Sequence, residues 1–189
     1  FLITSVGSLS DGYIPDFEGV GSFKGVSCHT SRWPAEGIDL AGKRVGVIGT
    51  GATGVQLITE IAKEVGHMTV FQRTANYCAP LRNGPIDDKT QREIKARYPE
   101  IFKKCSETPG SFMHEFDPRS AMEVSPEERL GQYEKLWQEA GFKKWLSNFH
   151  DVMVPGQANE DYAEFVRNKI RERVNDPVVA EMLVPKDHM

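Results

Sequence analysis

The sequence predicts an α/β fold in which a β-α-β unit is followed by a mostly α-helical region. Two short apolar runs, residues 45–48 and 68–71, have the β-branched and aromatic content of buried parallel strands. Apolar residues at helical spacing lie between them, so the unit fits a right-handed crossover connection. With 189 residues, 39% of them hydrophobic, the chain is long enough to bury a core.

The segment before this unit is expected to be loop-rich. Residues 1–6 form an apolar run that predicts a strand, and glycine and proline then recur through residues 7–40 with few helix signals. Residues 41–85 hold the β-α-β unit, whose helix has apolar positions recurring from Val55 to Val65. Gly66 is expected to end that helix.

Residues 86–189 are expected to form a helical subdomain. Ser125 followed by Pro126 has the pattern of an N-cap and a first helical position, and residues 159–174 predict a second amphipathic helix. Asp176 and Pro177 begin a last short helix. The apolar positions at helical spacing are Leu130, Tyr133, Leu136, Trp137, Ala140, Tyr162, Phe165, Val166, Ile170 and Val174. Trp137 and Trp145 are interpreted as core residues, and the Lys, Arg and Glu runs as solvated helix faces.

Composition excludes several classes of protein. The net charge of −4 argues against nucleic acid as the main partner, because duplex binding needs basic clusters. Three cysteines without a C-x-x-C pair indicate neither a disulfide framework nor a zinc site, so reduced thiols, no metal and a cytoplasmic location are expected. No apolar run approaches the roughly 20 residues of a membrane span. The chain starts at Phe1 inside an apolar run, and we expect a fragment of a longer protein whose helical subdomain is incomplete.

A glycine-rich turn is the clearest indication of a binding site in the sequence. Its G-x-G-x-x-G pattern follows a predicted strand and opens a predicted helix, which is the context that a dinucleotide-binding turn requires. The first glycine permits the tight turn, the second lets a pyrophosphate approach the backbone, and the third lets helix and strand pack closely. The helix N-terminus adds N–H donors and a positive dipole end. The candidate cofactor-binding residues here are Gly49, Thr50, Gly51, Ala52, Thr53, Gly54 and Gln56.

The end of the second strand favours NADPH over NADH. An NAD site would place an acidic residue there to hold the ribose 2′-hydroxyl group, whereas this chain has Gln72, Arg73 and Thr74. Arg73 has the charge to pair with a 2′-phosphate, and Thr74 offers a hydroxyl donor. The alternative is that Arg73 is a solvated cation at a strand end.

A segment upstream of the glycine turn resembles a family fingerprint. Residues 23–34 match the pattern F-x-G-x-x-x-H-x-x-x-W-P of Baeyer–Villiger monooxygenases, the flavoproteins that convert ketones to esters or lactones. Residues 71–77, 165–171 and 183–186 also resemble that family, so the similarity covers essentially the whole chain. The five fingerprint residues are Phe23, Gly25, His29, Trp33 and Pro34.

The resemblance implies a Rossmann-type, three-layer NADPH-binding domain inserted into an FAD-binding domain, with a helical subdomain inserted in turn. It assigns residues 1–40 to the end of an FAD-domain segment and linker, 41–85 to NADPH binding and 86–189 to the helical subdomain. It also implies NADPH, FAD, O₂ and a ketone as partners. The FAD glycine motif and the catalytic arginine are expected outside the chain, so no catalytic residue is assigned and this chain alone is not expected to be active. The alternatives are a flavin monooxygenase acting on nitrogen or sulfur, and a non-catalytic NADPH-binding regulatory module.

His29 has several possible roles. A general base, a metal ligand and a packed structural residue are all open to a single histidine, and no second ligand stands at metal-binding spacing. The resemblance implies that His29 lies near the linker between the two dinucleotide domains and couples their motion. Cys28 and Cys78 show no sequence pattern of an activated nucleophile.

Overall fold

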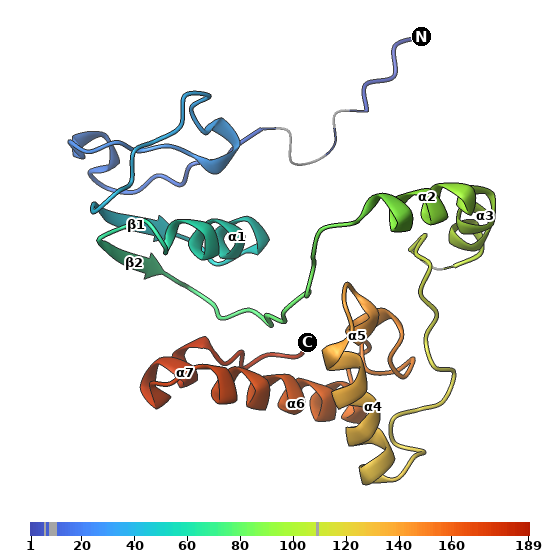
Figure 1. Cartoon of the computed structure of the whole chain (residues 1–189). Coiled ribbons are helices and arrows are strands. Elements are labelled where there is room, and N and C mark those ends of the chain that lie inside the picture. Colours follow the sequence, from blue (N-terminus) through green and yellow to red (C-terminus); the bar gives the residue numbers. More distant parts are fainter. Residues whose placement is uncertain (6, 8–10, 109) are drawn as a thin grey trace. The chain divides into compact units, whose positions relative to one another are not determined.

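The computed structural model describes residues 1–5, 7, 11–108 and 110–189. They form two compact units, residues 1–73 and residues 74–189, each with its own helices (Figure 1). Among these residues no helix is both long and apolar enough to cross a lipid bilayer.

The first unit contains the predicted β-α-β unit. Strands β1 (Arg44–Ile48) and β2 (His67–Phe71) pair in parallel, with Arg44 opposite His67 and Ile48 opposite Phe71. Helix α1 (Ala52–Ile61) connects them and packs on β1 (Figure 1). The α/β class and the parallel crossover are therefore confirmed.

Two expectations about this unit are wrong. Helix α1 ends at Ile61, not at Gly66. Gly66 lies at the entry to β2, where its N–H donates to the Lys43 carbonyl oxygen at 2.9 Å. A Cβ atom there would lie 2.4 Å from the Gly42 carbonyl oxygen, so close backbone approach, not helix termination, explains this glycine. The strands are also less buried than expected, because α1 is the helix that packs on them within the described chain and Val47 is their one buried residue.

The strand expected over residues 1–6 is not formed in residues 1–5, and Val6 lies outside the described residues. A strand needs a hydrogen-bonding neighbour, and β1 and β2 pair only with each other in the described sheet. The rest of this region is loop with two short 3₁₀ helices, η1 (Val20–Ser22) and η2 (Thr30–Arg32). The loop-rich prediction is thus confirmed there.

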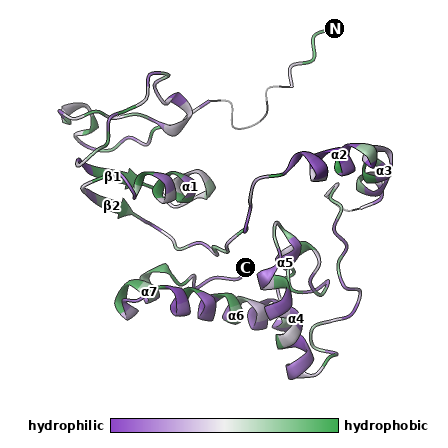
Figure 2. Cartoon of the chain, viewed as in Figure 1, coloured by the Kyte–Doolittle hydropathy of each residue, from purple (hydrophilic) through white to green (hydrophobic). Residues whose placement is uncertain are grey.

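The second unit is helical, as the sequence predicts. Its helices are α2 (Asp88–Ala96), α3 (Tyr98–Glu107), α4 (Pro126–Gln138), α5 (Lys143–Leu146), α6 (Gln157–Arg173) and α7 (Pro177–Leu183). The predicted caps form: Ser125 Oγ accepts from the Glu128 N–H at 3.2 Å, and Asp176 Oδ1 accepts from the Val178 N–H at 2.8 Å. Helix α2 is hydrophilic along its length and buries no residue, which fits a solvated face (Figure 2).

Aromatic side chains of α4 and α6 make the core of the second unit. The rings of Tyr133 and Tyr162 have centroids 4.8 Å apart, and Trp137 meets Phe165 edge-on at 5.7 Å. Trp137 is buried as predicted, and Trp145 is half-buried against this cluster. Leu130 and Ala140 are exposed, against expectation: Leu130 lies in the first half of α4, and Ala140 follows the end of that helix at Gln138.

Candidate dinucleotide-binding site

The first glycine of the turn has a backbone conformation that other residues rarely adopt. Gly49 follows β1 directly and has φ of +99°, in the region that glycine alone enters without strain. Its N–H donates to the Phe71 carbonyl oxygen at 2.9 Å, which ties the turn to the end of β2. The turn is thus fixed at the carboxyl edge of the strand pair.

The third glycine allows the helix to approach the strand. A Cβ atom on Gly54 would lie 2.4 Å from the Gly49 carbonyl oxygen and 3.1 Å from its carbon. Both are backbone atoms, so a side chain here would push the start of α1 away from the turn. The structural role expected of Gly54 is therefore visible in the geometry.

Packing within the described chain does not require glycine at position 51, the second glycine of the turn. A Cβ atom on Gly51 would meet no atom within 4 Å, and the φ of −68° is ordinary for any residue. The space beside it lies at the N-terminus of α1, where no side chain caps the helix and the first turn holds no acidic residue. An uncapped N-terminus beside open space favours an anionic group such as a phosphate.

The other predicted turn residues surround this position. Ala52 and Thr53 are exposed in the first turn of α1, Gln56 is exposed one turn later, and Thr50 is half-buried before the helix. The glycine turn and these residues all belong to the first unit.

Arg73 lies at the same edge of the strand pair, two residues after β2 ends. It is exposed and has no ion-pair partner among the described residues. No acidic residue occurs between Glu64 and Asp87, so the sequence on either side of this strand end carries no negative charge. Thr74, also exposed, is the first residue of the second unit.

The glycine of the upstream fingerprint lies against the ring of its phenylalanine. A Cβ atom on Gly25 would lie 2.6 Å from Cζ of the Phe23 ring, so the aromatic ring occupies the space that a side chain would need. Trp33 is 38% exposed, and the Pro34 carbonyl oxygen accepts the Gly37 N–H at 3.0 Å in the turn that follows. The fingerprint residues are thus part of one local loop structure.

His29 acts as a helix cap in this loop. Its Nδ1 atom accepts the Ser31 N–H at 3.2 Å and so caps η2. Ser31 Oγ lies 2.7 Å from the same Nδ1. Sequence reasoning did not find Ser31 or Gly12, whose Cβ position would lie 3.0 Å from Nδ1.

We predict that His29→Asn retains the cap and His29→Ala loses it, because asparagine keeps a side-chain acceptor for the Ser31 N–H. Loss of a cap costs about 1 kcal/mol, or roughly fivefold in local opening. Amide hydrogen exchange over residues 30–32 measures this: faster exchange in the alanine variant and near-parental exchange in the asparagine variant are expected. Equal acceleration in both variants would rule out capping as the role of His29.

Metal binding and nucleophilic chemistry find no support among the described residues. No three His, Cys, Asp or Glu side chains gather there as a set that could hold a metal ion. Cys28 and Cys78 are free and exposed, and partial desolvation raises the pKa of the Cys78 thiol, which disfavours the reactive thiolate.

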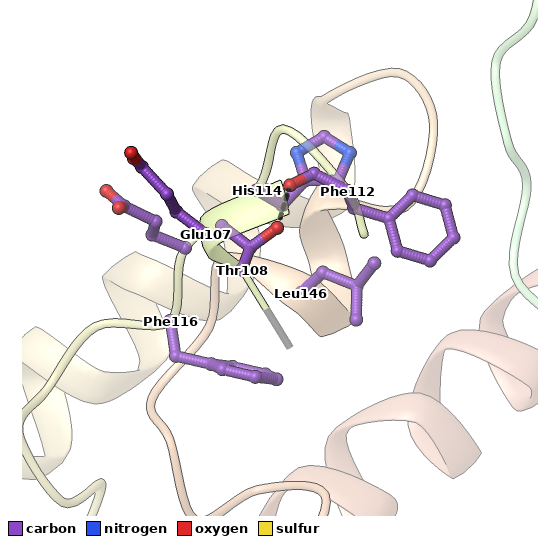
Figure 3. A pocket seen from close by; sticks show the side chains of 7 residues that line it. Glu107, Thr108, Phe112, His114, Phe116 and Leu146 are labelled. Carbon is purple, nitrogen blue, oxygen red and sulfur yellow. Dashed lines mark hydrogen bonds between the residues drawn. The ribbon is translucent and has the colours of Figure 1, made fainter. Parts of the chain in front are cut away.

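A small cavity in the second unit lies among residues that no motif singles out (Figure 3). Its volume of about 140 Å³ is below the roughly 300–1,000 Å³ typical of small-molecule sites. The Thr108 hydroxyl donates to the Phe112 carbonyl oxygen at its rim, and burial together with the nearby Lys143 charge lowers the pKa of His114. It is lined by Glu107, Thr108, Phe112, His114, Glu115, Phe116 and Leu146. It is not the dinucleotide site.

Comparison with known proteins gives relatives along the whole chain. The chain is 46% identical over 194 residues to 2-oxo-Delta(3)-4,5,5-trimethylcyclopentenylacetyl-CoA monooxygenase of Pseudomonas putida, covering 100% of this chain and 36% of the relative. It is 42% identical to cyclohexanone 1,2-monooxygenase of an Acinetobacter species, covering 99% and 34%. Phenazine N-monooxygenase PhzNO1 of Lysobacter antibioticus is 39% identical, with 99% and 35% covered. The chain thus spans about a third of the length of these relatives.

Solved structures of monooxygenases also match almost the whole chain. The crystal structure of OTEMO in complex with FAD and NADP superposes with a TM-score of 0.93 at 46% identity, covering 97% of this chain and 35% of the other. Cyclohexanone monooxygenase from Rhodococcus sp. Phi1 bound to NADP⁺ gives a TM-score of 0.91 at 42% identity, with 97% and 34% covered. No family model matches the chain.

Proposed function

We propose that this chain, a relative of Baeyer–Villiger monooxygenases along its whole length, is the NADPH-binding part of an FAD-dependent enzyme of that kind. The complete enzyme converts ketones to esters or lactones with O₂ and NADPH, and FAD is held mostly by segments outside this chain. The observation that carries the proposal is the glycine turn, whose second glycine faces open space at the uncapped start of α1.

The predicted domain roles belong to this proposal. Residues 41–85 bind NADPH within a three-layer Rossmann-type domain, residues 1–40 belong to the FAD-domain segment and linker, and residues 86–189 form the helical subdomain. The exposed Ile48 and Phe71 at the strand ends support a further covering layer in the complete protein, since parallel strands are normally covered on both faces. A cytoplasmic location remains a prediction.

The residues of this chain bind and orient the nucleotide. The N–H groups at the start of α1 donate to the pyrophosphate, and the open side of Gly51 lets it approach the backbone. Arg73 pairs with the 2′-phosphate, Thr74 donates its hydroxyl to it, and Gln56 lines the approach along α1. Bound NADPH supplies the hydride that reduces FAD, through which one atom of O₂ enters the ketone and the other leaves as water.

The fingerprint loop has a positioning role in this proposal. The His29 cap gives residues 30–32 a hydrogen-bonded local structure, and the Phe23 ring lies against Gly25, which supports an ordered linker that transmits domain motion. His29 has no carboxylate partner among its described hydrogen bonds, which favours positioning over proton transfer.

A second candidate function is oxygenation of nitrogen. The 39% identity to phenazine N-monooxygenase supports it, since the nucleotide site would be the same and only the acceptor would differ. Oxygenation of sulfur and a regulatory, non-catalytic module are the remaining alternatives.

The test is product analysis with the complete protein. We expect ketone-dependent oxidation of NADPH with cyclic or linear ketones, and an ester carrying one ¹⁸O atom when ¹⁸O₂ is supplied. Aromatic amines and sulfides serve as competing substrates in parallel. N-oxides or sulfoxides without esters would replace the proposal by the second function, and NADPH binding without any turnover would indicate a regulatory module.

A further inference from the structure

One short helix of the second unit presents an apolar surface to solvent. Ala180 is the one buried residue of α7, and Figure 2 shows this helix in largely hydrophobic colours, in contrast to α2. Four apolar side chains of α7 are between 37% and 69% exposed, and we call them the α7 stripe: Val178, Val179, Met182 and Leu183.

The members of the α7 stripe are neighbours on the helix. Each of its two valines lies four positions before one of its other two members, which is the spacing at which helical side chains meet. Single exposed apolar side chains are ordinary on a protein surface, whereas a contiguous group of them marks a contact surface. Glu181, the one charged residue of α7, pairs with Arg171 of α6 at 2.7 Å, so the charge of α7 is held toward that helix and the stripe itself is uncharged.

Capping at both ends holds α7 in place. At its start, Asp176 Oδ1 accepts the N–H groups of Val178 at 2.8 Å and of Val179 at 3.2 Å. At its end, the N–H of the buried Val184 donates to the Ala180 carbonyl oxygen at 3.0 Å. A helix of seven residues does not persist in water without such contacts, so the caps and the packing on α6 fix it.

The segment that follows α7 is anchored as well. Arg167, a buried residue of α6, donates from Nε to the Pro185 carbonyl oxygen at 2.9 Å and from Nη2 to the Asp187 carbonyl oxygen at 3.3 Å. Arg167 also donates to Tyr77 Oη at 2.9 Å, and the Tyr77 hydroxyl donates to the Asp187 carbonyl oxygen at 2.6 Å. The α7 stripe therefore belongs to a helix that is fixed before, along and after its length, and it cannot turn inward without breaking these contacts.

We propose that the α7 stripe is the docking surface for the part of the complete protein that lies outside residues 1–189, an inference that rests on the proposed function. The chain covers 34% to 36% of the relatives described above, so most of a protein of that length lies outside it. In the proposed function this outside part holds FAD. Its surface against the stripe is apolar, because a polar group would lose its hydration there without gaining a hydrogen-bond partner.

The size of the α7 stripe favours a segment of the same polypeptide over a separate molecule. A stable interface between two proteins uses about 20–30 residues on each side, far more than four side chains supply. A covalently linked segment needs less contact area, since the link gives it an effective concentration on the order of millimolar. A second copy of the protein would need further surface that the stripe does not provide.

Site-specific photo-crosslinking in the complete protein tests the proposal. A benzophenone amino acid is placed at Met182 in the stripe and, as a matched control, at the neighbouring Glu181, which pairs with Arg171 of α6. Mass spectrometry after irradiation identifies the attached peptides. We expect the probe at Met182 to attach to peptides outside residues 1–189 and the control probe to attach to α6.

A charge substitution gives a second readout. Met182→Lys should lower the melting temperature of the complete protein by about 4 °C or more, because the ammonium group would be buried without a partner. Asn175→Lys adds a positive charge at an exposed polar position just before α7 and should leave the melting temperature nearly unchanged.

Several results would overturn the docking surface. They are attachment of the Met182 probe to a second copy, to residues 1–73 or to the α6 peptides of the control alone, and equal melting temperatures for Met182→Lys and Asn175→Lys. If the protein with the probe at Met182 fails to fold, the same probe at Val178 decides. FAD and NADPH binding are measured separately, since a complete protein that binds neither would overturn the proposed function, whatever the stripe contacts.

Discussion

Replacing Arg73 by alanine is expected to weaken NADPH binding by about tenfold or more and to leave NADH binding nearly unchanged. A charge-assisted hydrogen bond contributes about 1.5–3 kcal/mol, and NADH has no 2′-phosphate for Arg73 to contact. Arg73 is exposed and has no ion-pair partner among the described residues, so its removal leaves no carboxylate unpaired. Steady-state kinetics of the complete enzyme with each cofactor measures the effect.

Arg44→Ala provides the matched control. Arg44 is an exposed arginine at the opposite end of the same strand pair, opposite His67. Its removal changes the net charge equally but at a distance where salt screens most of the interaction, so NADPH affinity should stay close to that of the parent. Equal losses for NADPH and NADH in Arg73→Ala would contradict the phosphate-binding role.

Replacing Gly54 by alanine is expected to lower stability and abolish measurable nucleotide binding. The new methyl group would lie 2.4 Å from the Gly49 carbonyl oxygen, and backbone atoms cannot turn away as a side chain can. Overpacking of this kind costs about 1–3 kcal/mol. Alanine also gains about 1 kcal/mol in helix propensity, which offsets only part of that cost. Thermal unfolding and NADP⁺ titration measure the two effects.

The Gly51→Ala variant separates the effect of the turn on stability from its effect on nucleotide binding. Its methyl group would meet no atom within 4 Å, so the melting temperature should stay at or near the parental value. Nucleotide binding should still weaken, because the methyl group lies where the pyrophosphate approaches. A Gly51→Ala protein that binds NADP⁺ as tightly as the parent would show that the open space beside α1 is not the phosphate site.

Local sequence patterns predicted most of the secondary structure. The β-α-β unit and the caps at Ser125 and Asp176 depend on residues a few positions apart, and all are confirmed. The strand expected over residues 1–6 is wrong for residues 1–5, because a strand depends on a partner that the local sequence does not specify. Gly66 was misassigned because a glycine near a helix end looks the same whether it stops the helix or allows a distant backbone to approach.

The candidate site was predictable only in part. The glycine turn and Arg73 follow from spacing along one β-α-β unit. Arg167 looks like any charged residue of an amphipathic helix, and its partner Tyr77 is 90 residues away, so no local pattern identifies their contact. The capping contact of His29 likewise depends on the position of the Ser31 N–H, which the sequence alone does not give.

The central claim is that the strand end after β2 distinguishes a 2′-phosphate. Calorimetric titration of the complete protein with 2′,5′-ADP and with 5′-AMP tests it most directly, since the two ligands differ only in that phosphate. We expect 2′,5′-ADP to bind at least about tenfold more tightly, and Arg73→Ala to remove most of the difference. Equal affinity for the two ligands in the parent protein would contradict the account.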